Sequence, residues 1–92
     1  VVMSEWRELR EGISVIRVIN DAAEFERLCE RKAPGADAKS HWIDGKARVC
    51  GNEYVVVSNN SLCRAYVINL LNEGDEGFKL TIPFDACTLV KY

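Results

Sequence analysis

The chain lacks most of the residue patterns that mark a chemical site. It has one histidine, His41, and its four cysteines are widely spaced, with no Cys-x-x-Cys pair. Zinc sites commonly draw their ligands from such close pairs, so their absence argues against a structural metal. No Gly-x-Gly and no Gly-Lys-Ser/Thr motif occurs, which excludes the common phosphate-binding loops. The carboxylates in residues 73–76 are too few for an EF-hand calcium loop. We therefore expect no metal, no cofactor and no catalytic residue.

The chain also has no excess of either charge and no long apolar run. Lys and Arg number 12 against 14 Asp and Glu, a net charge of −2, which argues against nucleic acid as a partner. No apolar stretch approaches the roughly 20 residues of a membrane span. The first residues lack the basic start and apolar core of a signal peptide, so we expect a cytoplasmic protein. Its 92 residues, 48% of them hydrophobic and 28% charged, predict one globular domain over residues 1–92.

The cysteines allow three interpretations, of which a disulfide framework is conceivable for their even number but disfavoured without a sign of secretion. Each lies beside apolar residues, and with no sign of secretion we favour free thiols that act as small buried apolar side chains. The alternative is a thiol-dependent enzyme that pairs one cysteine with His41. No cysteine begins a predicted helix, where the helix dipole would lower its pKa, and Cys29 lies near a helix end that has the opposite effect. We expect His41 to lie in an exposed loop.

One helix is predicted near the start of the chain, after a strand over residues 13–19 that is rich in β-branched side chains. Asp21 can cap the helix, with Glu24 three residues further on. One narrow apolar stripe follows at helical spacing: Phe25, Leu28 and Cys29. Basic side chains near residue 31 and the Pro34-Gly35 pair mark its end. The sequence therefore predicts a helix over residues 22–31 that packs on a sheet by one edge.

The remainder predicts a β series after a loop over residues 35–46. Strands are expected over residues 53–58, 63–71, 78–82 and 87–92, and a shorter one is possible at 47–50. Turns are expected at residues 59–61 and 72–77, and a bend or 3₁₀ turn at 83–86. Tyr66 and Ile68 should lie on one face of their strand. In the next strand Phe78, Leu80 and Ile82 should point inward.

These elements predict a mainly β fold. We expect a small barrel or half-open sheet of five to six short antiparallel strands, with one helix near residues 22–31. Because the sequence shows no catalytic or metal-binding pattern, we favour a binding or scaffolding domain over an enzyme.

The order of elements also resembles a known family. A strand ends at Asn20, a helix contains Phe25, a loop contains Trp42, and Gly51 begins a strand. The chain closes with the segment Leu-Thr-Ile-Pro-Phe-Asp-Ala-Cys-Thr-Leu-Val over residues 80–90. Over residues 12–91 this order resembles the SH3-like barrel repeats of the mind-bomb type, found in some ubiquitin ligases and in proteins of unicellular eukaryotes. The resemblance implies a partner-binding domain without an active site. The chain departs from that family in its longer turn at 72–77 and in its cysteine-rich apolar positions.

A bulky cluster in the loop is the candidate partner-binding surface. It consists of Lys39, His41, Trp42 and Ile43 in a segment of otherwise small residues. Tryptophan is enriched at interfaces because one side chain supplies a large contact area and a donor. Trp42 can instead pack on the core as a lid, and both interpretations stay open here. We expect the partner to be a protein or peptide; the alternatives are the thiol enzyme and a nucleic-acid-binding SH3-like barrel.

Overall fold

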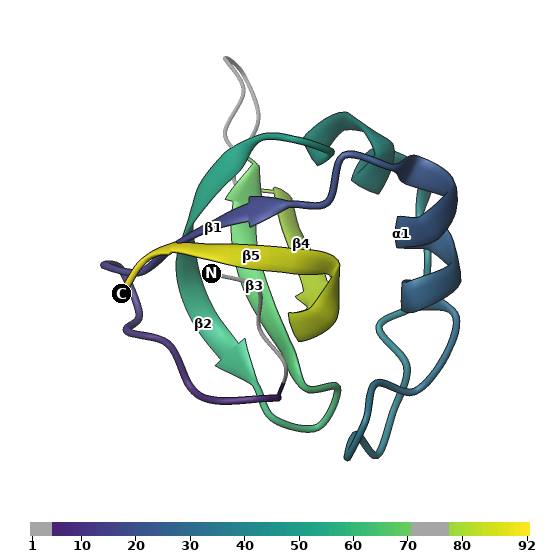
Figure 1. Ribbon diagram of the computed structural model, residues 1–92, viewed down its shortest axis with the longest axis horizontal. Helices are drawn as coiled ribbons and strands as arrows, with labels where there is room; N and C mark the ends of the chain where they lie inside the picture. Colours follow the sequence, from purple (N-terminus) through teal and green to yellow (C-terminus); the bar gives the residue numbers. More distant parts are fainter. Residues whose placement is uncertain (1–4, 71–77) are drawn as a thin grey trace.

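The computed structural model describes residues 5–70 and 78–92, which form one curled antiparallel sheet with a helix at its side (Figure 1). The strands are β1 (Val15–Val18), β2 (Glu53–Asn60), β3 (Ala65–Leu70), β4 (Phe78–Pro83) and β5 (Cys87–Lys91). Their order in the sheet is β4-β3-β2-β1-β5. The helices are α1 (Ala22–Cys29) and the 3₁₀ helices η1 (Asp44–Val49) and η2 (Phe84–Ala86). The predicted mainly β fold is confirmed, as a half-open sheet. The turn expected at 72–77 lies outside the described residues.

Helix α1 begins where the sequence predicted. The side chain of Asp21 accepts a hydrogen bond from the Glu24 backbone N–H at 3.1 Å, which satisfies one of the free donors of the first turn. The Glu24 carboxylate pairs with Arg27. The apolar stripe is buried and faces the sheet: Phe25, Leu28 and Cys29. The helix ends at Cys29, two residues before the predicted end, and Glu30 is its C-terminal cap.

The core lies inside the curl of the sheet. Its fully buried side chains come from every strand except β5 and from α1, η1 and η2; the largest of them include Tyr66, Phe25, Phe84, Ile16, Ile68 and Leu80. Register shifts in β1 opposite β5, and in β2 opposite β3, bend these strands so that the sheet wraps around this core. At the start of β2, Gly51 has φ +77, and a Cβ there would lie 2.8 Å from the Asn20 side-chain oxygen. Only glycine fits this turn without a shift of Asn20.

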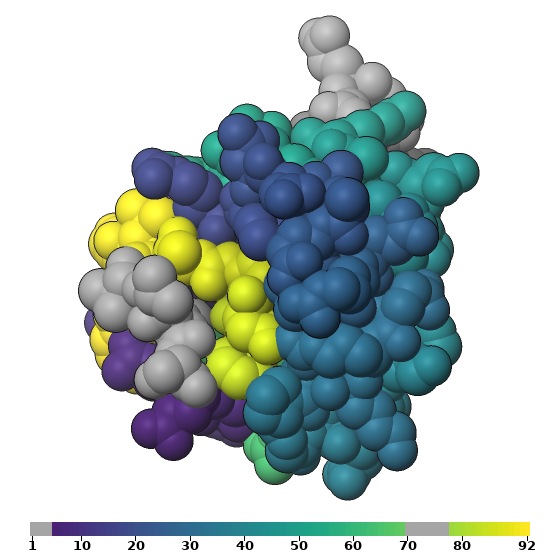
Figure 2. Space-filling view, turned by 45° about the vertical axis from the view of Figure 1, so that its right-hand side comes forward, coloured from purple at the N-terminus to yellow at the C-terminus, as the bar shows by residue number. Residues whose placement is uncertain are grey.

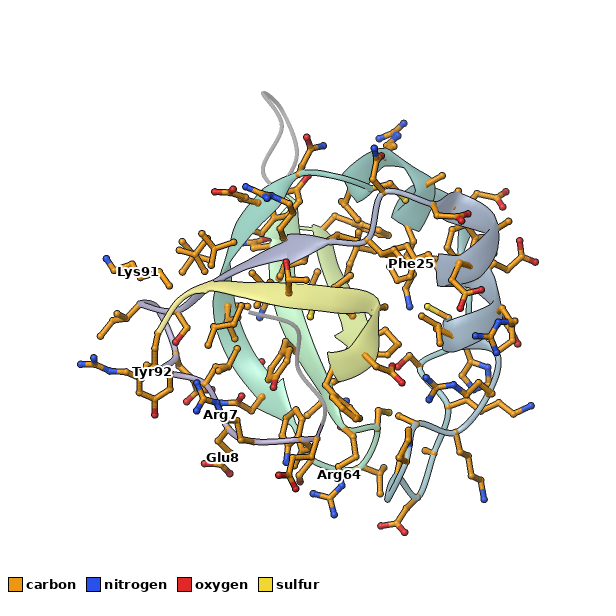
Figure 3. All side chains as sticks on the ribbon, viewed as in Figure 1. Arg7, Glu8, Phe25, Arg64, Lys91 and Tyr92 are labelled. Atoms are coloured by element: carbon orange, nitrogen blue, oxygen red, sulfur yellow. The ribbon has the colours of Figure 1, made fainter. Side chains whose placement is uncertain are left out.

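The segment before β1 closes one end of the sheet. The Trp6 ring stacks on Tyr66 with 4.9 Å between centroids, and the Tyr66 hydroxyl donates to the Arg7 carbonyl at 2.7 Å. The side chain of Asn59 both accepts from the Leu9 N–H and donates to the Leu9 carbonyl. Arg7 also lies over the Tyr92 ring, 4.9 Å from its centroid (Figure 3). Trp6 is thus partly buried against the core.

Two local predictions are wrong. The possible strand at 47–50 is part of η1, because the buried residues Lys46 and Val49 are three apart, which is the spacing of one 3₁₀ turn. The turn expected at 59–61 is displaced. Asn60 stays in β2 and its side chain accepts from the Cys63 N–H, while Arg64 supplies the left-handed residue with φ +53.

The prediction that Phe78 points into the core is wrong. Leu80 and Ile82 are buried as expected, but the Phe78 side chain is 51% exposed. Phe78 is the first residue of β4 and lies two residues before Leu80, the first buried side chain of that strand. The core therefore does not reach Phe78. Its ring lies beside the loop instead, since a Cβ on Gly45 would be 3.6 Å from Phe78 Cε1.

Candidate functional site

The predicted surface residues lie in a loop that is fixed to the end of α1. The His41 N–H donates to the Cys29 carbonyl at 3.0 Å, which satisfies a free acceptor of the last helical turn. The Trp42 N–H donates to the Glu30 carboxylate at 2.6 Å. His41 takes up φ +62, a left-handed conformation that is uncommon for a residue with a side chain. The loop is therefore held in one shape by the helix end.

The four residues have different surroundings. Lys39 and His41 are exposed, as expected for His41, and Ile43 is 42% exposed. Trp42 is partly buried against the core, with its ring edge-on to Phe25 at 5.3 Å between centroids. Phe25 itself projects from α1 toward the sheet (Figure 3). Packing of Trp42 on the core is thus observed, whereas partner binding by the loop stays a prediction.

A small pocket lies between this loop and strand β4. It has a volume of about 100 Å³ and is lined by Ser40, His41, Ile43 and Lys46 on one side and by residues 79–81 on the other. Strand β4 stands at the end of the strand order, so one of its edges has no neighbouring strand in the described sheet. The structure therefore joins two of the predicted residues, His41 and Ile43, with a strand that the sequence did not connect to them.

Lys46 is the unexpected member of this pocket. It is only 2% exposed, and its Nζ donates to the His41 carbonyl at 2.6 Å and to Cys29 Sγ at 3.4 Å. The same ammonium lies 5.9 Å from the centroid of the Phe25 ring. Burial lowers the pKa of Lys46, because it removes the charged form from water. Sequence analysis missed Lys46, although its spacing from Val49 was the available signal.

The thiols do not form a nucleophile with His41 in the described residues. All four cysteines are free, and Cys29, Cys63 and Cys87 are buried, as predicted for small apolar side chains. Burial raises the pKa of the Cys29 and Cys50 thiols and raises that of Cys87 to about 12. Each shift disfavours the reactive thiolate. Across residues 5–70 and 78–92 no group of three His, Cys, Asp or Glu side chains could hold a metal, and nothing points to catalysis.

A larger hollow of about 330 Å³ lies where β1 meets η2 and β5. It is lined by residues 17–20 and 85–88. Figure 2 faces this side, where the lime and yellow residues of η2 and β5 lie against the indigo and blue residues that lead from β1 into α1. Beside it Asp85 pairs with Arg31, which links η2 to the end of α1. This hollow contains none of the predicted surface residues.

Comparison with known proteins finds no family profile, no curated protein and no solved structure that matches the chain. In the part of the chain that the structure describes, no helix has the length and apolar character needed to cross a membrane.

Proposed function

We propose that this domain is a non-catalytic protein-interaction module that binds an extended segment of another protein. The binding surface consists of His41, Ile43, Phe78 and Lys79, and we name it the loop–β4 surface. The observation that carries the proposal is the exposure of two large apolar side chains beside one pocket. Ile43 lines the pocket and is 42% exposed, and Phe78, 51% exposed, directly precedes the pocket residue Lys79.

Exposed apolar side chains next to a hollow are a common feature of binding surfaces, because a partner can bury them together. Here their positions are fixed before binding. The loop is hydrogen-bonded to the end of α1 through His41 and Trp42, and Phe78 begins a strand. A surface of fixed shape loses little conformational entropy when a partner docks, which favours affinity.

The family resemblance stated above supports the same function, because mind-bomb-type repeats bind partners and have no active site. We propose a cytoplasmic location, because the first residues lack the pattern of a signal peptide.

The alternative of a thiol-dependent enzyme has lost its support, since the raised pKa values of three thiols oppose a thiolate at neutral pH. Nucleic-acid binding has gained no support.

The experiment is a selection of displayed random peptides against the domain, followed by affinity measurements on variants. The test variant is Ile43→Ser with Phe78→Ser. The matched control is Val55→Ser with Val90→Ser, which removes two side chains of similar exposure, 44% and 46%, from β2 and β5. Thermal unfolding of both variants verifies that they are folded.

We expect the selected peptides to bind the control variant like the wild type. The test variant should bind about ten-fold more weakly, or worse, because it lacks both apolar contacts. Failure to enrich any peptide would contradict the proposal. Equal binding by the test variant and the wild type would contradict the assignment to the loop–β4 surface.

A further inference from the structure

Lys46 is a buried lysine that belongs to no ion pair among the described residues. Its two hydrogen-bond contacts are the neutral His41 carbonyl and the Cys29 thiol, whose pKa burial raises. The ion pairs in the described residues are Arg17–Glu53, Arg27–Glu24 and Arg31–Asp85, and none includes Lys46. Glu30 is a carboxylate that raises the pKa of Lys46, and it already accepts the Trp42 N–H. A buried charge in this state is unfavourable unless a partner of opposite charge compensates it.

Lys46 also lines the pocket between the loop and β4, where such a partner can sit. An ammonium has three N–H donors, and the structure gives Lys46 two acceptors. Lys46 lines the 100 Å³ pocket, whose other residues include the hydroxyl-bearing Ser40 and Thr81 and a second lysine, Lys79. A water occupies roughly 10–15 Å³ by the same measure, so the pocket has room for a short polar group.

We propose that this pocket binds a carboxylate, with Lys46 as the buried cation that receives it. The inference rests on the proposed function and names its ligand: an Asp or Glu side chain of the extended segment that docks on the loop–β4 surface. A carboxylate can take the remaining Lys46 donor in a charge-assisted hydrogen bond and leave its second oxygen for a hydroxyl.

The apolar side chains indicate an acidic side chain rather than a chain terminus. Ile43 lies on the loop side of the pocket, and Phe78 lies at the start of the strand that forms the other side. A segment that contacts both must continue across the pocket, and the free edge of β4 offers a path for an extended chain. The extended segment of the partner therefore inserts an acidic side chain into the pocket, and apolar residues before and after it contact Ile43 and Phe78.

The first test uses sodium acetate and acetamide as probes, added to the ¹⁵N-labelled domain at constant ionic strength. We expect acetate, but not acetamide, to shift the amide signals of residues 40–46 and 79–81 in a saturable way. Lys46→Met should weaken acetate binding about ten-fold or more, because it removes the charge and the donor. The control is Lys91→Met, which removes one positive charge from an exposed position at the end of β5 and should leave acetate binding unchanged.

The second test needs no variant of the protein, so it decides the matter even if Lys46→Met does not fold. Peptides from the selection described above are made with blocked ends, and their acidic residue is replaced by the matching amide. We expect each Glu-to-Gln exchange to weaken binding to the wild-type domain about ten-fold.

The outcomes separate the two proposals. Peptides that bind equally well with Gln, together with acetate that shifts no pocket amide, would overturn the carboxylate site and leave the interaction module standing. Acetate binding that depends on Lys46, without any selected peptide, would support the site and overturn the proposed function.

Discussion

Trp42 is expected to hold the fold together rather than to report on binding alone. Replacement of a fully buried Trp or Phe by Ala costs about 3–5 kcal/mol, and Trp42 is partly buried, so roughly half of that applies. Loss of the edge-on contact with Phe25 adds about 0.5–1.5 kcal/mol. We therefore expect Trp42→Ala to lower the free energy of unfolding by about 2–4 kcal/mol, which lowers Tm by about 10–30 °C in a domain of this size.

The measurement is urea and thermal unfolding of Trp42→Ala, followed by circular dichroism. Ile43→Ala is the matched control, because the neighbouring side chain is 42% exposed and its loss should change stability by less than about 0.5 kcal/mol. Equal stability of the two variants would refute the packing of Trp42 on Phe25. It follows that Trp42→Ala cannot separate binding from folding, and that Ile43 and Phe78 are the positions that can.

Three further predictions concern the helix cap and the thiols. Asp21→Ala should lower the free energy of unfolding by about 1 kcal/mol, while Asp21→Asn should not, because asparagine also accepts the Glu24 N–H; urea unfolding measures both. Iodoacetamide at neutral pH should modify Cys50 first, since it is the most exposed of the four thiols, and Cys87 last. Peptide mapping by mass spectrometry measures the order of modification, and early modification of Cys87 would contradict its burial. Burial raises the pKa of Cys87 from 9.0 to about 12, so the stability that its protonated thiol contributes is complete below pH 9.0 and is lost as the pH rises toward 12. Relative to Cys87→Ala, the wild type should lose up to about 1.4 kcal/mol per pH unit in that window, measured by urea unfolding with a non-thiol reductant; parallel pH profiles would contradict the assignment.

The elements that the sequence predicted well depend on local signals. The start of α1 follows from residues 21–24, a span of four residues. It contains both the capping side chain, Asp21, and the backbone donor that it satisfies, the Glu24 N–H. The position of η2 follows from Pro83, whose ring fixes the backbone just before the turn. The shared face of Tyr66 and Ile68, which are both buried, follows from the two-residue period of a strand. In each case a few neighbouring residues determine the outcome.

The errors arise where distant residues decide. Asn59 and Asn60 favour a turn locally, but Asn59 stays in β2 because its side chain pairs with the backbone of Leu9, fifty residues away in sequence. Phe78 follows the alternation of β4, yet its exposure depends on how far the core extends. The helical form of residues 44–49 depends on Lys46 and Val49, which both face the interior. The sequence does not indicate this pattern, because a charged lysine is expected at the surface.

The candidate site divides in the same way. The loop of His41, Trp42 and Ile43 could be predicted from its composition, since bulky side chains stand out among small ones. The opposite wall could not, because Lys79 and Thr81 reach the pocket only through the order of the sheet. Lys46 was overlooked because a lysine is expected at the surface, and a buried one is evident only once its surroundings are known.

The contacts that shape the pocket are also those that bury Lys46, so the site and the fold share their residues. The His41 backbone donates to the end of α1 and accepts from Lys46, which ties the helix, the loop and η1 together at one residue. The left-handed conformation of His41 lets its N–H and carbonyl serve both roles while its side chain stays exposed. Such strained residues persist where the surrounding structure determines them, as it does here through α1 and Lys46. A partner therefore meets a surface whose shape is set by the core, and variants that probe binding must leave Lys46, Trp42 and the His41 backbone contacts intact unless stability is measured beside affinity.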